Sequence, residues 1–101
     1  MTEQEIREGN KLIAEFMINP PMVTIFMEYH KDWNWLMLVV GAINKIKLGD
    51  EAFDVIIYKT TVHINDSRQI LIETTGKDII KAVWQAVVEF IKWYNVQSPK
   101  S

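Results

Sequence analysis

Residues 79–94, IIKAVWQAVVEFIKWY, carry the clearest structural pattern in the chain. Apolar side chains recur there every three or four positions, which predicts an amphipathic helix. Thr75 and Asp78 just before it resemble a capping box. A polar line runs along the other side, formed by Lys77, Lys81, Gln85, Glu89 and Lys92. Because the apolar side is so wide, we expect this helix to be the central packing element.

Two further helices are predicted. Residues 2–18 begin with Thr2 and Glu5 in a capping-box spacing and end at the Pro20-Pro21 pair. Gly9 lowers the helix propensity of that segment by about 1 kcal/mol relative to alanine, so its first turns are expected to fray. Residues 32–47 form the second helix, with Asp32 as the N-cap and Gly49 as the stop signal.

Residues 53–75 predict a β-hairpin around the NDS turn at 65–67. A three-residue loop best sorts the side chains, with Lys59 opposite Glu73 on a polar face. The apolar face would then hold Tyr58, Thr60, Val62, Ile64, Ile70, Ile72 and Thr74. Residues 22–28 add a short strand on β-propensity alone. We therefore predict an α+β fold, with three helices on a small antiparallel sheet in the order helix, strand, helix, hairpin, helix. Residues 1–96 would form one domain and 97–101 a flexible tail.

Composition narrows the function classes. Of the 101 residues 49% are hydrophobic, enough for one core, and the formal net charge is −2. That charge gives no global attraction to nucleic acid. The absence of cysteine excludes thiolate chemistry and cysteine-ligated metals. A polar N-terminus and the lack of a long apolar run indicate a soluble, cytoplasmic protein with no membrane association.

Reactive groups are few. His30 and His63 would need a carboxylate such as Asp32 to form a metal or small-ligand site, and nothing in the sequence brings them together. Ser67 lies in a turn, which disfavours a nucleophilic triad. The stretch TTGKD at 74–78 lacks the first glycine and the hydroxyl residue of a phosphate loop. We expect no catalytic residues, no metal and no cofactor, hence no enzyme.

Six residues remain as a candidate interaction surface. Tyr29 and His30 precede the second helix and are not explained by its periodicity, and Trp93 is offset from the main apolar stripe of the last helix. Trp93 would cap the edge of the core or mark an interface. Lys77, Lys81 and Lys92 follow the polar line of that helix, where a solvated face is favoured over a nucleic-acid footprint.

At EGNKLIAEFM, YHKDWNWLMLVV and KAVWQAVVEFIKWYN the chain resembles small uncharacterised proteins encoded by phages and prophages of the Bacteroidetes. These blocks cover a little over a third of the chain, and Leu38 stands where members of that group tend to have proline. The group has no assigned activity to transfer. The resemblance implies an accessory gene product that acts in the cytoplasm of a bacterial host.

The sequence as a whole favours a non-enzymatic protein-binding module that contacts a host or phage protein. Its apolar content is high enough to leave aromatic surface for a partner or a second copy. A homodimer is also reasonable, because a small sheet has edges that pairing covers. The alternative is nucleic-acid binding through Lys77, Lys81 and Lys92 with Trp93 exposed beside them.

Overall fold

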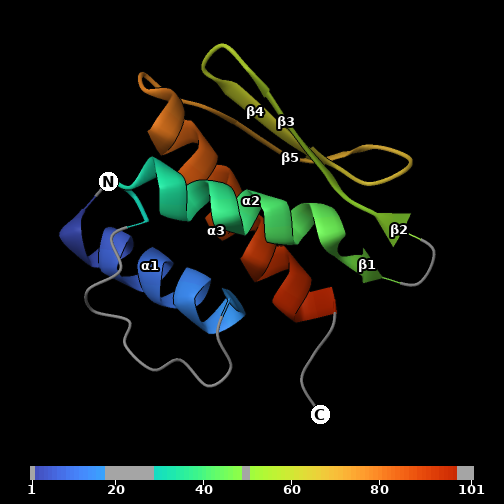
Figure 1. The fold of residues 1–101 in the computed structure, drawn as a ribbon, viewed down its shortest axis with the longest axis horizontal. Coiled ribbons are helices and arrows are strands. Elements are labelled where there is room, and N and C mark those ends of the chain that lie inside the picture. Colours follow the sequence, from blue (N-terminus) through green and yellow to red (C-terminus); the bar gives the residue numbers. More distant parts are fainter. Residues whose placement is uncertain (1, 18–28, 49–50, 98–101) are drawn as a thin grey trace.

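Three helices pack on one side of a small antiparallel sheet in a computed structural model of the chain (Figure 1). The structure describes residues 2–17, 29–48 and 51–97. The elements are α1 (Glu3–Met17), α2 (Trp33–Lys45), β1 (Lys47–Leu48), β2 (Glu51–Ala52), β3 (Asp54–Tyr58), β4 (Thr61–Asn65), β5 (Ile70–Thr75) and α3 (Ile79–Gln97). The predicted α+β class and the order of its helices are confirmed. The strand predicted at 22–28 and the end of the predicted tail, 98–101, lie outside the described residues.

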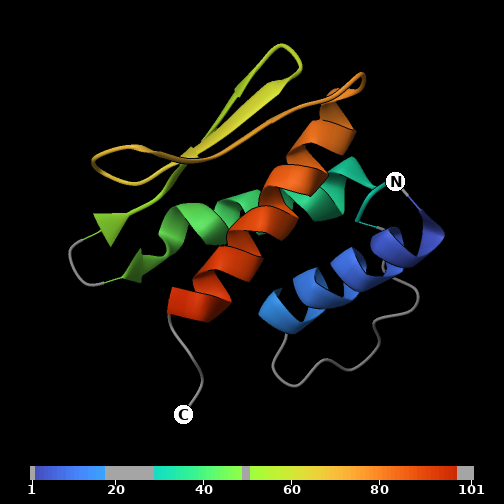
Figure 2. The same ribbon diagram turned by 180° about the vertical axis from the view of Figure 1, so that it is seen from behind.

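The last helix is the centre of the fold, as the sequence predicts. α3 contacts α1, α2, β4 and β5, and Figure 2 shows it crossing in front of α2, with the sheet on one side and α1 on the other. Eight of its residues are buried, including Trp84 and Phe90. Its last residue, Gln97, belongs to the segment predicted as a tail, so the helix extends into that segment.

The start of α1 confirms the capping box, but Gly9 corrects the expected fraying. The Glu5 N–H donates to Thr2 Oγ1 at 3.1 Å, and the Thr2 N–H donates to Glu5 Oε1 at 3.2 Å. Gly9 is buried against α3, where a Cβ atom would overlap the ring of Trp84. The low helix propensity of glycine is therefore offset by close helix packing.

The start of α2 is also confirmed, since Asp32 Oδ1 accepts from the Trp35 N–H at 3.1 Å. Its end is not. Ile46 has an extended backbone, with φ −74° and ψ 139°, and its N–H bonds to the carbonyl of Ile43. The chain then enters β1, which pairs with β2, so the two residues 46–47 predicted as helix are extended instead.

The predicted single hairpin at 53–75 is wrong at its first half, because a turn at Lys59 and Thr60 divides it into β3 and β4. Lys59 has φ 54°, a left-handed conformation that side chains other than glycine rarely adopt. The three strands form a meander in the order β3-β4-β5. The turn places Tyr58 in β3, and its side chain does not lie on the buried face as predicted. His63, not Lys59, is opposite Glu73.

The β4–β5 connection differs from the prediction in length but keeps part of its outcome. Asn65 pairs with Ile70, which leaves a four-residue loop, and Ile64 pairs with Ile72, which makes Leu71 an extra residue in a bulge. Because of this extra residue, Ile72 faces the same side of the sheet as Ile64, which is the arrangement that the predicted three-residue loop would also have produced. The inner face accordingly holds Val62, Ile64, Ile72 and Thr74, as predicted. Ile70 is the exception, being paired with Asn65 on the outer face and 51% exposed.

Candidate functional site

The outer face of the β3-β4-β5 sheet is not covered by the described helices, since all three lie on its other side (Figures 1 and 2). We call it the open face. Its side chains form three rows across the strands: Asp54, Asn65 and Ile70; Ile56, His63 and Glu73; Tyr58, Thr61 and Thr75. Three large apolar side chains, Ile56, Tyr58 and Ile70, are thus presented to solvent.

Two polar contacts fix the middle of the open face. His63 Nε2 lies 2.7 Å from Glu73 Oε2, and both side chains are partly or largely exposed. The hydroxyl oxygens of Thr61 and Thr75 lie 3.1 Å apart in the next row. Cross-strand pairs of this kind hold neighbouring strands in register. They also place polar groups between the apolar side chains of β3 and Ile70 of β5.

β3 is an edge strand of this sheet among the residues that the structure describes. The Val55 N–H donates to Asn44 Oδ1 of α2 at 3.0 Å, so it points away from β4. Because backbone groups alternate in direction along an antiparallel strand, the N–H and C=O of Ile57 also point away from β4. We call the outward backbone groups of Val55 and Ile57 the β3 edge. Asn44 accepts from the Val55 N–H of this edge, and the Ile57 N–H, two residues further along, lies beyond the reach of the Asn44 side chain.

The β3 edge lies over one face of α2. β3 contacts α2, and Figure 1 shows it starting near the C-terminal end of the helix and rising away from it toward the turn at Lys59 and Thr60. Trp33, Met37, Gly41 and Asn44 share a helix face at spacings of three and four residues. Among the described residues, no atom lies within 4 Å of the position that a Cβ on Gly41 would occupy. The described elements therefore leave space beside the helix face that carries Asn44.

Tyr29 and His30, both in the predicted interaction surface, join the helices instead. Tyr29 is 5% exposed and packs on Trp35, with ring centroids 5.8 Å apart, and burial raises the pKa of its phenol. Asn10 of α1 accepts from the Trp84 indole N–H at 2.9 Å through Oδ1. Its Nδ2 lies 2.9 Å from His30 Nδ1. Since an indole nitrogen only donates, the amide group of Asn10 is oriented so that it donates to His30.

The other four predicted surface residues do not form one surface. Trp93 is half-buried and packs edge-on against Phe53, with centroids 5.7 Å apart, so it caps the core edge. Lys77 and Lys81 are exposed near the start of α3, whereas Lys92 is close to its end. Trp93 is thus partly buried against the core, whereas the nucleic-acid alternative expects it to be exposed beside the lysines.

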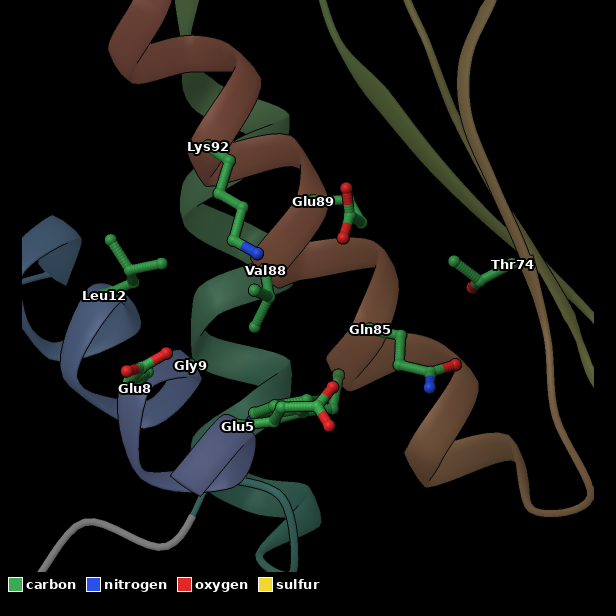
Figure 3. A pocket seen from close by; sticks show the side chains of 10 residues that line it. Glu5, Glu8, Gly9, Leu12, Thr74, Gln85, Val88, Glu89 and Lys92 are labelled. Carbon is green, nitrogen blue, oxygen red and sulfur yellow. The ribbon is translucent and has the colours of Figure 1, made fainter. Parts of the chain in front are cut away.

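Lys92 instead borders a cleft of about 340 Å³ between α1 and α3 (Figure 3). Its rim carries the carboxylates Glu5, Glu8 and Glu89. Two of these have partners within α1: Glu5 in the capping box, and Glu8 with Gln4 Nε2 at 3.1 Å. The Thr2 backbone N–H holds the pKa of Glu5 below its ordinary value, with a smaller contribution from Lys92. The cleft is therefore mainly acidic around an apolar floor that includes Trp84.

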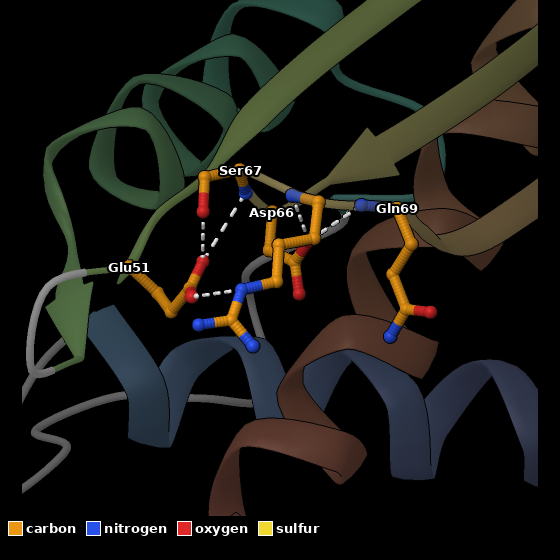
Figure 4. A network of polar contacts seen from close by, with 5 residues as sticks. Glu51, Asp66, Ser67 and Gln69 are labelled. Carbon is orange, nitrogen blue, oxygen red and sulfur yellow. Dashed lines mark hydrogen bonds and ion pairs between the residues drawn. The ribbon is translucent and has the colours of Figure 1, made fainter.

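Ser67 and Glu51 form a structural contact rather than a catalytic one (Figure 4). The Ser67 hydroxyl donates to Glu51 Oε2 at 2.5 Å, and Arg68 Nε lies 3.5 Å from Glu51 Oε1. Asp66 Oδ1 accepts from the backbone N–H groups of Arg68 and Gln69 at 2.7 and 2.8 Å. These bonds order the β4–β5 loop and dock it on β2.

The two histidines lie on different elements. His30 contacts Asn10 at the helix junction, and His63, predicted beside Gln69, lies on the open face beside Glu73. In the described parts of the chain no three His, Asp or Glu side chains gather closely enough to hold a metal ion.

Ile56, Ile57 and Tyr58 are the exposed residues that sequence reasoning missed. Their exposure depends on the turn at Lys59 and Thr60, which contains none of the glycine, asparagine or aspartate signals of a tight turn. The four apolar residues 55–58, followed by Lys59 and the β-branched pair Thr60 and Thr61, are typical of one long strand. Only the left-handed Lys59 reveals the turn.

Comparisons with family models, curated proteins and solved structures find no match. The resemblance to phage and prophage proteins therefore stays a prediction. No helix among the described residues is long and apolar enough to cross a membrane.

Proposed function

We propose that the chain is a non-enzymatic protein-binding module and that the open face is its binding surface. The observation that carries the proposal is the exposure of Ile56, Tyr58 and Ile70 on the solvent side of an antiparallel sheet, where polar side chains are usual. Exposed apolar groups surrounded by polar ones are typical of interaction surfaces. His63 and Glu73 provide hydrogen-bonding groups between them.

Charge indicates the chemistry of the partner. The open face carries the carboxylates of Asp54 and Glu73 and no lysine or arginine side chain. A complementary partner surface would combine apolar side chains with lysine or arginine, because opposite charges across an interface favour the correct orientation. The resemblance to phage and prophage proteins supports an accessory factor that contacts a host or phage protein in the bacterial cytoplasm.

The experiment compares capture of a partner by matched surface variants. Wild type, Ile56→Ser/Tyr58→Ser and the control Val96→Ser serve as baits in a lysate of a Bacteroidetes host, and captured proteins are identified by mass spectrometry. Val96 is 74% exposed near the end of α3, outside the open face. A protein captured by wild type and by the control is then purified and titrated against all three baits.

We expect the open-face variant to bind the purified partner at least about tenfold more weakly than the Val96 control does, since interface energy concentrates in a few apolar or aromatic anchors. Circular dichroism checks that both variants remain folded. Equal binding by the open-face variant and the control would place the interface elsewhere. Failure of wild type to capture any protein that survives purified titration would contradict the proposed function.

A further inference from the structure

We infer that the β3 edge binds an extended segment of the protein partner as an additional antiparallel strand, lying over the Met37 and Gly41 face of α2. This mode rests on the proposed function, because it specifies how the partner reaches the open face. Strand addition to an exposed sheet edge obtains its affinity from backbone hydrogen bonds and its specificity from alternating side chains. The β3 edge supplies both requirements.

The hydrogen-bonding requirement is met at Ile57. Natural edge strands are protected by proline, by bulges or by inward-pointing charges, and β3 (DVIIY) contains no proline and pairs with β4 in unbroken register. Asn44 covers the Val55 N–H, but the N–H and C=O of Ile57 are directed outward two residues further along. A strand opposite Ile57 would exchange two hydrogen bonds with it.

The side-chain requirement follows from the same alternation. Partner residues opposite Ile56 and Tyr58 would lie on the open face beside those exposed side chains, and β-branched residues fit such cross-strand positions. The partner residue opposite Ile57 would point to the side of the sheet that faces α2, where no described residue fills the space beside Gly41. Apolar residues are therefore favoured at all three partner positions.

Charges at the ends of β3 define the charges expected at the two ends of an antiparallel partner strand. Asp54 begins the strand and Lys59 follows it, and neither has an ion pair among the described residues. An antiparallel partner strand would place its C-terminal end beside Asp54 and its N-terminal end beside Lys59. We therefore expect an acidic residue at the start of the bound segment and a basic residue at its end.

The occupant is a single strand rather than a second copy of the chain. Antiparallel pairing of two β3 strands requires a two-fold axis perpendicular to the sheet, so the helices of both copies would lie on the same side. α2 contacts β3 and bonds to its edge through Asn44. The two α2 helices would then be brought into the same space beneath the joined strands, whereas one extended segment needs only the width of a strand.

The test uses the whole protein and a synthetic probe, the blocked hexapeptide Glu-Val-Val-Val-Thr-Lys. The matched control peptide exchanges its terminal charges, Lys-Val-Val-Val-Thr-Glu. Binding is followed by two-dimensional ¹H–¹⁵N NMR titration, which detects dissociation constants in the range of about 1 mM. We expect the largest amide shifts at Ile57 and its neighbours in β3, and weaker binding of the charge-exchanged peptide.

Two substitutions separate the backbone from the side chain. Ile57→Pro removes the outward N–H without removing a β3–β4 hydrogen bond, because that N–H does not face β4. Ile57→Ala shortens the side chain and keeps the N–H. We expect Ile57→Pro to reduce peptide affinity by at least about fivefold relative to Ile57→Ala, with the β4 and β5 amide spectrum preserved in both.

Three results would overturn strand addition: no binding of the peptide by wild type, equal binding by the Pro and Ala variants, or a dimer that Ile57→Pro converts to a monomer. The last, read by light scattering, would make a second copy the occupant. The outcome is independent of the lysate experiment. A partner whose binding depends on Ile56 and Tyr58 but tolerates Ile57→Pro would leave the proposed function in place and remove only this mode of binding.

Discussion

The two faces of the β3-β4-β5 sheet differ in what determines their residues. On the inner face Val62 and Ile64 are fully buried. Next to this face, α1 and α3 are joined by the buried hydrogen bond between Trp84 and Asn10 and by the close approach of Gly9 to Trp84. On the open face Ile56 and Tyr58 have large apolar side chains with no helix over them in the described structure. Packing explains the inner face, and stability alone does not explain the outer one. An exposed apolar side chain that packs against none of the described helices is a candidate for binding.

The largest test of this difference compares two isoleucines on opposite faces. Ile64→Ala is expected to lower the free energy of unfolding by about 2–5 kcal/mol, because it leaves a cavity at a fully buried site. Ile56→Ala is expected to lower it by less than about 1 kcal/mol, because that side chain is 48% exposed. Urea unfolding followed by circular dichroism measures both. Similar losses at the two positions would show that the open face is also packed.

The next largest loss of stability is expected from breaking the buried polar contact at the helix junction. Asn10→Leu removes the acceptor of the Trp84 indole N–H and the partner of His30 Nδ1. We expect a loss of about 2 kcal/mol in the free energy of unfolding, because a buried donor without a partner costs about 1–3 kcal/mol. Asn34→Leu, at an exposed position of α2, is the control and should change stability by less than about 0.5 kcal/mol. A neutral Asn10→Leu would mean that water replaces the amide.

Two glycines in helices give opposite signs. Gly9→Ala places a Cβ atom against the Trp84 ring and should lower the free energy of unfolding by about 1–2 kcal/mol, despite the better helix propensity of alanine. The added methyl group of Gly41→Ala meets no atom of the described residues within 4 Å, so this change should raise the free energy of unfolding by about 0.5–1 kcal/mol. Both changes are read from urea midpoints at equal slope. A stabilising Gly9→Ala would contradict the close approach of α1 and α3.

Sequence reasoning succeeded where periodicity and burial agree. The apolar stripe of α3, the Thr2 and Asp32 caps and the inner face of β4 all follow from local pattern. It failed where a tertiary contact overrides local preference. The low helix propensity of Gly9 suggests fraying. The structural reason for a glycine at this position is the ring of Trp84, which packs against it and is 75 positions away in the chain.

The candidate site was missed for a related reason. Its position depends on a turn that the residue types do not signal and on a bulge that places Ile70 on the outer face. Tyr29 and Trp93, which are singled out because helical periodicity does not explain their positions, have packing roles. The sequence identifies apolar and aromatic side chains, but only the arrangement of the strands and helices shows which of them are exposed to solvent.

The turn that creates the open face should carry measurable backbone strain. Lys59 has φ 54°, and its Nζ lies 5.5 Å from the centre of the Tyr58 ring. Lys59→Gly and Lys59→Ala both remove that contact, and only glycine adopts the left-handed conformation without steric conflict. The glycine variant should therefore be more stable than the alanine variant by about 1 kcal/mol in thermal unfolding. Equal stability would indicate that the turn changes conformation in the variants.

The smallest effect is expected at the exposed start of α1, on the packed side of the molecule but away from its core. The Thr2 N–H lowers the pKa of Glu5 in the folded state below its ordinary value of 4.5. The carboxylate thus contributes stability above the unfolded pKa, and this contribution is lost as the pH falls through the lower, folded value. Glu5→Gln cannot titrate, so stability should depend less on pH below about 4.5 in the variant than in wild type. Urea unfolding at a series of pH values between 3 and 6 measures the two slopes. Identical slopes would show that the hydrogen bonds of the capping box are made equally well by the neutral acid, which would separate the geometry of the cap from its charge.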